Sequence, residues 1–278
     1  MGKMIVTEGN YSKKSYLLKN SKLSIHSIEE LCYCIIKNPE LCEDFLYDRD
    51  LATFMDEELG LRERANLLAD CIERDAPLKD LATVVFCSCD YLVREEIEDF
   101  VEELSRAERS EKWIRIKNKA DSYLSLENYK NAVINYRSLV KDAGNLGITS
   151  ENLGDIYHNM GIAFLHTEGF ETAAECFRMA YEMNNREESL ESYLLALKFA
   201  ERNEEFKTAL EVYDIPEKTV ERLRSAVLHT ELEASDEAEL YELGEAEKLL
   251  KSGRTEEFYD TVARMTAEMK EQYIKYNE

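Results

Sequence analysis

The sequence has 278 residues, enough to bury a sizeable core in one elongated domain or in two. Its 10 glycines, 3 prolines and 33% charged residues predict an all-α protein with exposed helical faces. The formal net charge of −23 excludes nucleic-acid and membrane partners from our prediction, because an acidic surface repels phosphates and anionic lipid heads. Neutral or basic partners fit better, although the charge could also serve solubility alone.

Seven cysteines at irregular spacings are typical of free thiols in a reducing compartment. No stretch approaches the length of a membrane span, and residues 1–19 lack the apolar run of a signal peptide. We therefore predict a cytoplasmic protein. We interpret the pairs Cys32/Cys34 and Cys87/Cys89 as small buried residues of helices rather than metal ligands, because side chains two positions apart on a helix diverge.

The first regular helix is expected directly after Ser27. Glu30 follows Ser27 by three residues, which is the capping-box signature of a helix start. This helix should end by Lys37, because Asn38-Pro39 follows. Five or six helices with one-sided apolar faces are predicted over residues 27–104, and one of them is expected to carry Leu81 to Cys89.

The charged stretch Ser105–Lys112 is the predicted domain boundary. It lacks proline and glycine, so we also consider a continuous helix across it. The boundary divides the chain into an N-terminal helical domain, residues 1–108, a central domain, residues 109–216, and C-terminal helices, residues 217–278. The N-terminal domain could also consist of decayed repeats.

One pattern recurs in the central domain, where an aromatic residue precedes apolar residues three, four, seven, ten and eleven positions later. The first copy is Tyr129, Ala132, Val133, Tyr136, Leu139 and Val140, and the second is Phe170, Ala173, Ala174, Phe177, Ala180 and Tyr181. A third copy begins at Phe206 and runs into Pro216. A small residue, Ala120 or Gly161, lies in the helix before the first and second copies and should let the two helices approach closely.

These residues resemble the tetratricopeptide repeat, a helix-turn-helix unit of about 34 residues. The matching residues are Ala120, Tyr123, Tyr129, Ala132, Tyr136 and Leu139, then Tyr157, Met160, Gly161, Phe164, Phe170, Ala173, Phe177 and Ala180, and finally Tyr193, Ala196, Phe206 and Ala209. The resemblance covers roughly residues 113–216. It implies helical hairpins in a right-handed superhelix, between an N-terminal helical bundle and C-terminal capping helices.

The spacing departs from the family between the first two units. Ala120 and Gly161 are 41 positions apart, about seven more than one repeat. The excess lies between Lys141 and Leu153, either as a loop or as about one extra turn on each flanking helix.

The tail is expected to form further helices, with an exposed turn or helix start at Glu231–Glu239. These helices should cap the stack, or form a homodimer through Met265, Met269 and Tyr273.

We find no phosphate loop, Walker lysine, serine elbow or metal-binding histidine helix, and we predict a non-enzymatic protein without metal or cofactor. The resemblance implies a concave groove, lined by the first helix of each pair, that binds extended peptides. It places the groove at Lys117, Asp121 and Leu124, at Asp155, His158, Asn159, Ile162, Leu165 and His166, and at Glu191, Leu195 and Lys198.

The best-known subset of the family grips a carboxylate at the end of a chaperone with lysines, asparagines and an arginine. Asp121 here replaces an asparagine and Glu191 a cation, so a carboxylate would be repelled. We predict instead a scaffold or adaptor whose groove binds a protein or peptide segment with apolar anchors and some positive charge. The alternative is that the groove holds the protein's own residues 1–26.

A second class of function stays open. Bacterial peptide-sensing regulators place a helical effector domain before tetratricopeptide repeats, and residues 27–104 could be such a domain. The acidity of this region, and its lack of a recognition helix with several bases, argue against DNA binding.

Overall fold

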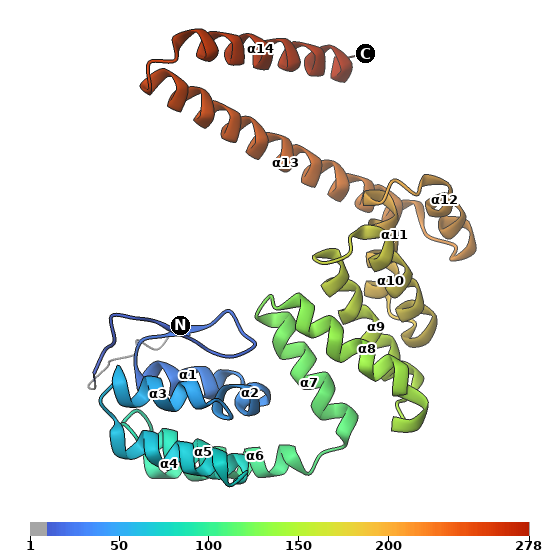
Figure 1. Cartoon of the computed structure of the whole chain (residues 1–278). Coiled ribbons are helices and arrows are strands. Elements are labelled where there is room, and N and C mark those ends of the chain that lie inside the picture. The colour runs from blue at the N-terminus through green and yellow to red at the C-terminus, as the bar shows by residue number, and fades with distance from the viewer. Residues whose placement is uncertain (1–9, 278) are drawn as a thin grey trace. The chain divides into compact units, whose positions relative to one another are not determined.

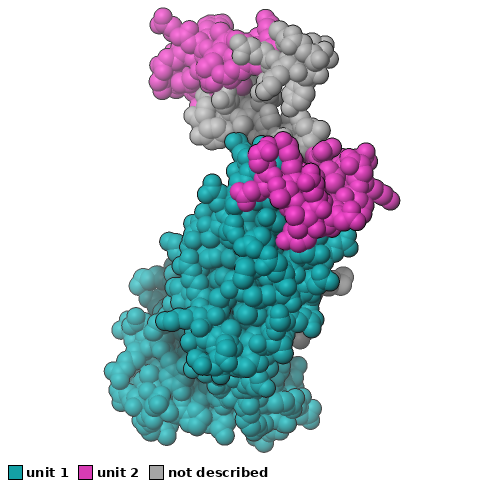
Figure 2. All heavy atoms as spheres, turned by 90° about the vertical axis from the view of Figure 1, so that its right-hand side faces the viewer, with its two compact units in different colours: residues 1–203 teal, residues 204–278 magenta. Residues whose placement is uncertain are grey.

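The computed structural model describes residues 10–277, which form an all-α helical-repeat fold (Figure 1). Apart from one hairpin of two-residue strands, every described element is a helix, so the predicted fold class is confirmed. Nothing is described of the side chains of residues 228–229, 231–243, 245, 269 and 271–277. The chain divides into two compact units, residues 1–203 and 204–278 (Figure 2).

The first unit begins with the antiparallel pair β1, Tyr16–Leu17, and β2, Ser24–Ile25. A bundle of short helices follows. Its members are α1 Ile28–Lys37, the 3₁₀ helix η1 Pro39–Leu41, α2 Cys42–Leu46, α3 Arg49–Glu57, α4 Arg62–Glu73, α5 Leu78–Phe86 and α6 Arg94–Glu108. Six α-helices agree with the five or six predicted for this region.

Local capping sets the bounds of α1. The Ser27 hydroxyl accepts the Glu30 backbone N–H at 3.2 Å, and the Glu30 carboxylate accepts the His26 N–H at 2.6 Å. These bonds satisfy donors that a helix start leaves without partners. The predicted start after Ser27 and the predicted end at Lys37 are both confirmed.

The predicted helix through Cys89 is wrong, because α5 ends at Phe86. Beyond it, Ser88 turns back onto the helix: its N–H donates to Val85 O at 3.0 Å and its hydroxyl to Val84 O at 2.7 Å. Such tight bonds close the last turn of a helix. Cys89 therefore lies in the segment after α5 rather than on its apolar face.

A continuous helix across the charged boundary is also not observed. Helix α6 ends at Glu108, and α7 begins at Lys112. The Arg115 guanidinium donates to Glu108 O, so a cation covers a carbonyl that the end of α6 exposes. The break therefore has a capping partner although it contains neither proline nor glycine.

The rest of the first unit consists of longer helices, with α7 against α8 and α9 against α10. Their bounds are α7 Lys112–Ser125, α8 Tyr129–Leu146, α9 Ser150–Leu165, α10 Phe170–Asn184 and α11 Glu187–Phe199. Most of the excess spacing between the first two pairs lies in the helices. Helix α8 has 18 residues against 15 in α10, α9 has 16 against 14 in α7, and only residues 147–149 connect α8 to α9.

Small residues let α9 and α10 approach closely, as predicted. A Cβ atom on Gly161 would lie 2.7 Å from Cε1 of the buried Phe177, and one on Gly154 would lie 2.7 Å from Cβ of Asn184. Ala173, on α10, is fully buried. The pair is therefore built on contacts that a larger residue would disrupt.

The second unit contains most of α12 Asn203–Val212, together with α13 Glu217–Lys251 and α14 Thr255–Asn277. The turn or new helix start predicted at Glu231–Glu239 is wrong, because α13 runs through it without a break. Glutamate and alanine favour helices, so few apolar residues do not mark a helix end. None of the described helices combines the length and apolar composition that crossing a bilayer requires.

The residues predicted for a homodimer lie in α14. Met265 is buried in the single chain. The side chains of Met269 and Tyr273 lie outside the described part of the structure.

The close approach of α9 and α10 can be tested by exchanging glycines for alanine. Gly161→Ala should lower the free energy of unfolding by about 1–3 kcal/mol, because the new methyl group displaces the buried Phe177 ring. Gly144→Ala is the control, since nothing lies within 4 Å of its Cβ position, and it should raise that free energy by up to about 1 kcal/mol. Urea denaturation followed by circular dichroism measures both. Equal effects at the two positions would contradict the packing described.

Candidate functional site

The predicted groove positions lie on α7, α9 and α11, and we call these twelve residues the lining face. They are Lys117, Asp121 and Leu124, then Asp155, His158, Asn159, Ile162, Leu165 and His166, then Glu191, Leu195 and Lys198. Eleven of them are half-buried and His166 is exposed. Partial exposure on helices lets such residues contact a ligand without dismantling the core.

The Asp121 carboxylate joins three helices. It accepts hydrogen bonds from the Lys117 ammonium at 2.6 Å, the Tyr136 hydroxyl at 2.5 Å and the Asn159 amide at 2.9 Å. These donors stand on α7, α8 and α9 respectively. A carboxylate that accepts three bonds is strongly satisfied. Two predicted groove positions, Lys117 and Asn159, are therefore held in place by a third.

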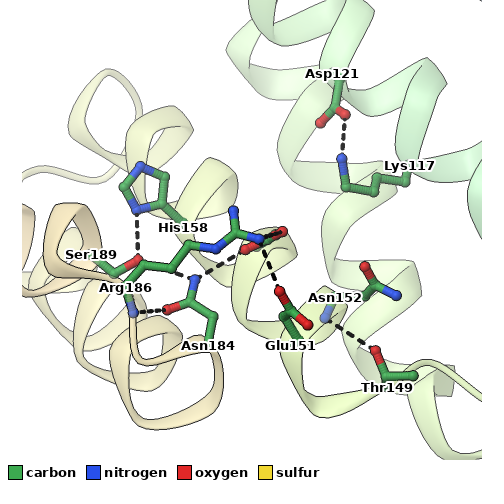
Figure 3. Close-up of polar contacts among 10 residues, drawn as sticks. Lys117, Asp121, Thr149, Glu151, Asn152, His158, Asn184, Arg186 and Ser189 are labelled. Atoms are coloured by element: carbon green, nitrogen blue, oxygen red, sulfur yellow. Dashed lines mark hydrogen bonds and ion pairs between the residues drawn. The ribbon is translucent and has the colours of Figure 1, made fainter.

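Burial and the nearby carboxylate act together on Tyr136. Its side chain is fully buried, which raises the pKa of the hydroxyl, and the charge of Asp121 raises this pKa further. The hydroxyl therefore remains a proton donor to Asp121. Lys117 and Asp121 form an ion pair within the protein, so the Lys117 charge is already compensated (Figure 3).

A second polar cluster connects α9 with the start of α11. Asp155 accepts a hydrogen bond from the Asn184 amide at 3.1 Å and forms an ion pair with Arg186 at 3.0 Å. Arg186 also reaches Glu151 at 3.3 Å, and the Asn184 amide also contacts Ser189 at 3.2 Å (Figure 3). The cluster thereby ties α9 to the connection between α10 and α11.

His158 belongs to this cluster rather than to open surface. Its side chain is only 12% exposed, and its Nδ1 lies 3.1 Å from the hydroxyl of Ser189 on α11. Burial lowers the pKa of His158, although Glu188 and Asp155 act in the opposite direction. The neutral imidazole is therefore favoured in the folded state, where it helps to position α11 against α9.

The two histidines of the lining face contact different neighbours. His166 caps the end of α9, and its ring stacks on Tyr129 with centroids 3.9 Å apart and planes 4° apart. His158 lies 5.3 Å from the Phe177 ring, between centroids. The structure therefore separates them, and they do not form one binding element.

The aliphatic members of the lining face are half-buried. They are Leu124 on α7, Ile162 and Leu165 on α9, and Leu195 on α11. The remaining cation, Lys198, donates to the Asn203 side chain at 2.9 Å. Most charges of the lining face are thus engaged within the protein, and its partly exposed aliphatic groups are the surface best suited to a partner.

The residues that hold the lining face together were not predicted. Tyr136 was predicted only as part of the recurring apolar pattern, with no role for its hydroxyl, and Asn184, Arg186 and Ser189 were not predicted at all. Asn184-Asn185 before a charged helix start is a local signal for a helix end, since Asn tolerates the left-handed backbone that Asn185 adopts. No local pattern predicts that Asn184 pairs with Asp155, because the two are distant in the sequence.

The described part of the N-terminal arm contacts other surfaces. The Asn10 amide donates to Leu59 O at 2.8 Å, and the Tyr16 hydroxyl to Asp48 at 2.9 Å. The Asn20 carbonyl accepts the Asn128 amide, in the turn between α7 and α8, at 2.5 Å. These bonds fix residues 10–26 on the bundle and on that turn. Residues 1–9 of the arm suggested as a groove occupant lie outside the described residues.

A cavity of about 630 Å³ lies in the first unit between the bundle and α7. The charged residues that border it include Glu40, Glu43, Glu103 and Glu108, together with Lys112 and Arg115. The residues that border it do not include those of the lining face. It is therefore a separate concave feature.

Among the residues that the structure describes, no three His, Cys, Asp or Glu side chains gather as a metal site would require. The chain was compared with protein-family models, curated proteins and solved structures, and none of them matched.

Removing the Asp121 carboxylate tests its role. Asp121→Ala should lower the free energy of unfolding by about 2–3 kcal/mol, because Lys117, Tyr136 and Asn159 lose an acceptor in partly buried surroundings. Asp142→Ala, at an exposed position of α8, is the matched control and should change it by less than about 0.5 kcal/mol. Chemical denaturation compares them. A loss at Asp121 no larger than at Asp142 would rule out a structural role.

The lowered pKa of His158 predicts a specific loss of stability in acid. The unfolded state takes up a proton near the ordinary pKa of 6.5, whereas the folded state takes it up only at lower pH. The stability due to the neutral ring is complete above pH 6.5 and declines below it. Lowering the pH from 6.5 to about 5 should therefore reduce the free energy of unfolding of His158→Gln less than that of the wild type. Urea denaturation at each pH measures both proteins. If their free energies of unfolding fall in parallel as the pH is lowered, His158 does not contribute to the loss of stability in acid.

Proposed function

We propose that this chain is a non-enzymatic interaction module that binds an extended segment of a partner protein along the lining face. One observation carries the proposal. Bonds through Asp121 and His158 connect α7 to α9 and α9 to α11, while aliphatic residues on the same three helices stay partly exposed. A surface of this kind is pre-organised, so binding a peptide would order few side chains.

The proposal includes membership in the tetratricopeptide family. Its support is the pairing of α7 with α8 and of α9 with α10, each joined by a short turn. The small residue Gly161 faces the aromatic Phe177 at the position that the resemblance assigns to close contact. The first helices, which line the groove in that family, are here the helices that carry the lining face.

The partner segment is proposed to be neutral to basic, with apolar anchors. Lys117 and Arg186 are each paired with a carboxylate, so neither is available to attract an acidic partner. Glu188, 80% exposed beside His158, could pair with a cation of the partner. Half-buried Ile162 and Leu195 offer apolar contacts. Such chemistry suits a scaffold or adaptor, which we place in the cytoplasm.

A second candidate function is a regulator in which the bundle responds to a bound peptide. Helix α7 contacts both parts: Asp121 lies on the lining face, while Lys119 pairs with Asp44 of α2 at 2.9 Å. The Tyr123 hydroxyl also donates to the Asp44 carboxylate. A ligand that shifted α7 would act directly on these contacts.

The test compares the same substitution at two isoleucines. Ile162→Glu introduces a carboxylate on the lining face, whereas Ile134→Glu does so on α8, at a side chain that is 64% exposed. In affinity purification from the native cell, the wild type and Ile134→Glu should retain the same partner. Ile162→Glu should bind it at least about tenfold more weakly, since a buried carboxylate without a partner opposes an apolar anchor.

Circular dichroism and the midpoint of thermal unfolding must be alike for both variants. If Ile162→Glu is folded and holds the partner as well as Ile134→Glu does, the lining face is not the binding surface. Binding would then belong to residues 1–108 or to the tail.

A further inference from the structure

Two cysteines from distant parts of the N-terminal bundle lie against each other. The Sγ atoms of Cys32, on α1, and of Cys89, beyond the end of α5, are 3.7 Å apart. Cys32 is fully buried and Cys89 is half-buried. Nearby Cys87 is exposed. The sequence pattern predicted Cys32 and Cys89 as separate buried residues, because Cys89 was expected on a helix.

We propose that Cys89 and Cys32 form an oxidative modification site, at which a hydroperoxide converts the two thiols into a disulfide between α1 and the segment after α5. Cys89 is the thiol that the peroxide reaches first, and Cys32 is the buried thiol that resolves the intermediate.

The geometry permits the bond with small movements. A disulfide bond is about 2.05 Å long, so the two sulfur atoms must approach by roughly 1.7 Å. Cys89 lies outside α5, so its backbone can adjust without breaking helical hydrogen bonds. The Cys32 thiol has only a weak further contact, with Val85 O at 3.9 Å. Little structure therefore opposes closure.

The surroundings divide the roles between the two sulfurs. A hydrogen bond from Cys32 and another from the Tyr91 backbone N–H lower the pKa of Cys89, against burial and the charges of Glu29 and Asp90. The hydrogen bond to Cys89 and burial raise the pKa of Cys32 well above its usual range. Because the thiolate is the nucleophile, the partly exposed Cys89 is the residue that reacts.

The proposed reaction consumes one hydroperoxide and two thiols. The Cys89 thiolate attacks one peroxide oxygen, the O–O bond breaks, and the departing alkoxide or hydroxide takes up a proton. The resulting sulfenic acid is attacked by the Cys32 sulfur. An S–S bond forms, Cys32 loses its proton, and water leaves. Both sulfurs are oxidised, and the peroxide is reduced to an alcohol or water.

The experiment uses the purified full-length chain, reduced and then treated with one equivalent of hydrogen peroxide. After alkylation of the remaining thiols, the intact mass should show the loss of two hydrogens and five alkylated cysteines. Peptide mapping should identify a link between Cys32 and Cys89. The disulfide should also raise the midpoint of thermal unfolding by about 5 °C, because it restricts the unfolded chain.

Three variants assign the roles. Cys87→Ser is the control, and it should form the disulfide at the wild-type rate. Cys89→Ser should consume peroxide at least about tenfold more slowly. Cys32→Ser should accumulate a sulfenic acid at Cys89 that dimedone traps.

Several results would overturn the proposal, and the first needs no variant. The proposal is excluded if treated wild-type protein carries no link between Cys32 and Cys89 while its thiols remain alkylatable or become sulfinic acids. Unchanged peroxide consumption by a folded Cys89→Ser would equally exclude Cys89 as the reactive thiol, as would loss of the disulfide in Cys87→Ser.

Discussion

The central part of the fold depends on the hydrogen bonds that the Asp121 carboxylate accepts. This carboxylate accepts bonds from residues of α7, α8 and α9, so it couples the first helix pair to the second. Gly161 against Phe177 sets the distance between α9 and α10, and His158 with Ser189 extends the arrangement to α11. Directional polar bonds thus fix the order of helices that apolar contacts alone would hold less specifically.

This network also determines which side chains of the lining face are available to contact a partner. The Lys117 ammonium is already held by the Asp121 carboxylate at 2.6 Å, so it is not available to a carboxylate of a partner. Displacing Asp121 would leave its charge partly buried and uncompensated, which is costly. The polar residues therefore act mainly as a frame. Half-buried aliphatic residues such as Ile162 remain as the surface on which the proposed binding of an apolar anchor depends.

Features that depend on residues close together in the sequence were predictable, and features that depend on distant partners were not. The capping residues Ser27 and Glu30 predicted the start of α1, and the small residue Gly161 predicted the close approach of α9 and α10. Both predictions were possible because capping and packing patterns are short-range. The end of α5 before Cys89 was missed because bonds from Ser88 close the helix within an apolar pattern. The continuity of α13 was not predicted, because the polar stretch Glu231–Glu239 was interpreted as an exposed turn or a helix start. Of the candidate site, the lining positions came from the family resemblance. Their partners did not, since Asp155 meets Arg186 only after folding.

The most direct test of the lining face as the binding surface is site-specific photo-cross-linking in the native cell. A benzophenone side chain would replace Ile162 on α9 or, in a matched strain, Ile134 on α8. We predict that illumination links the chain to a partner from position 162 and not from position 134. Cross-links from position 134 alone, or from neither position while the partner still co-purifies, would show that α7, α9 and α11 are a structural support and that the partner binds elsewhere.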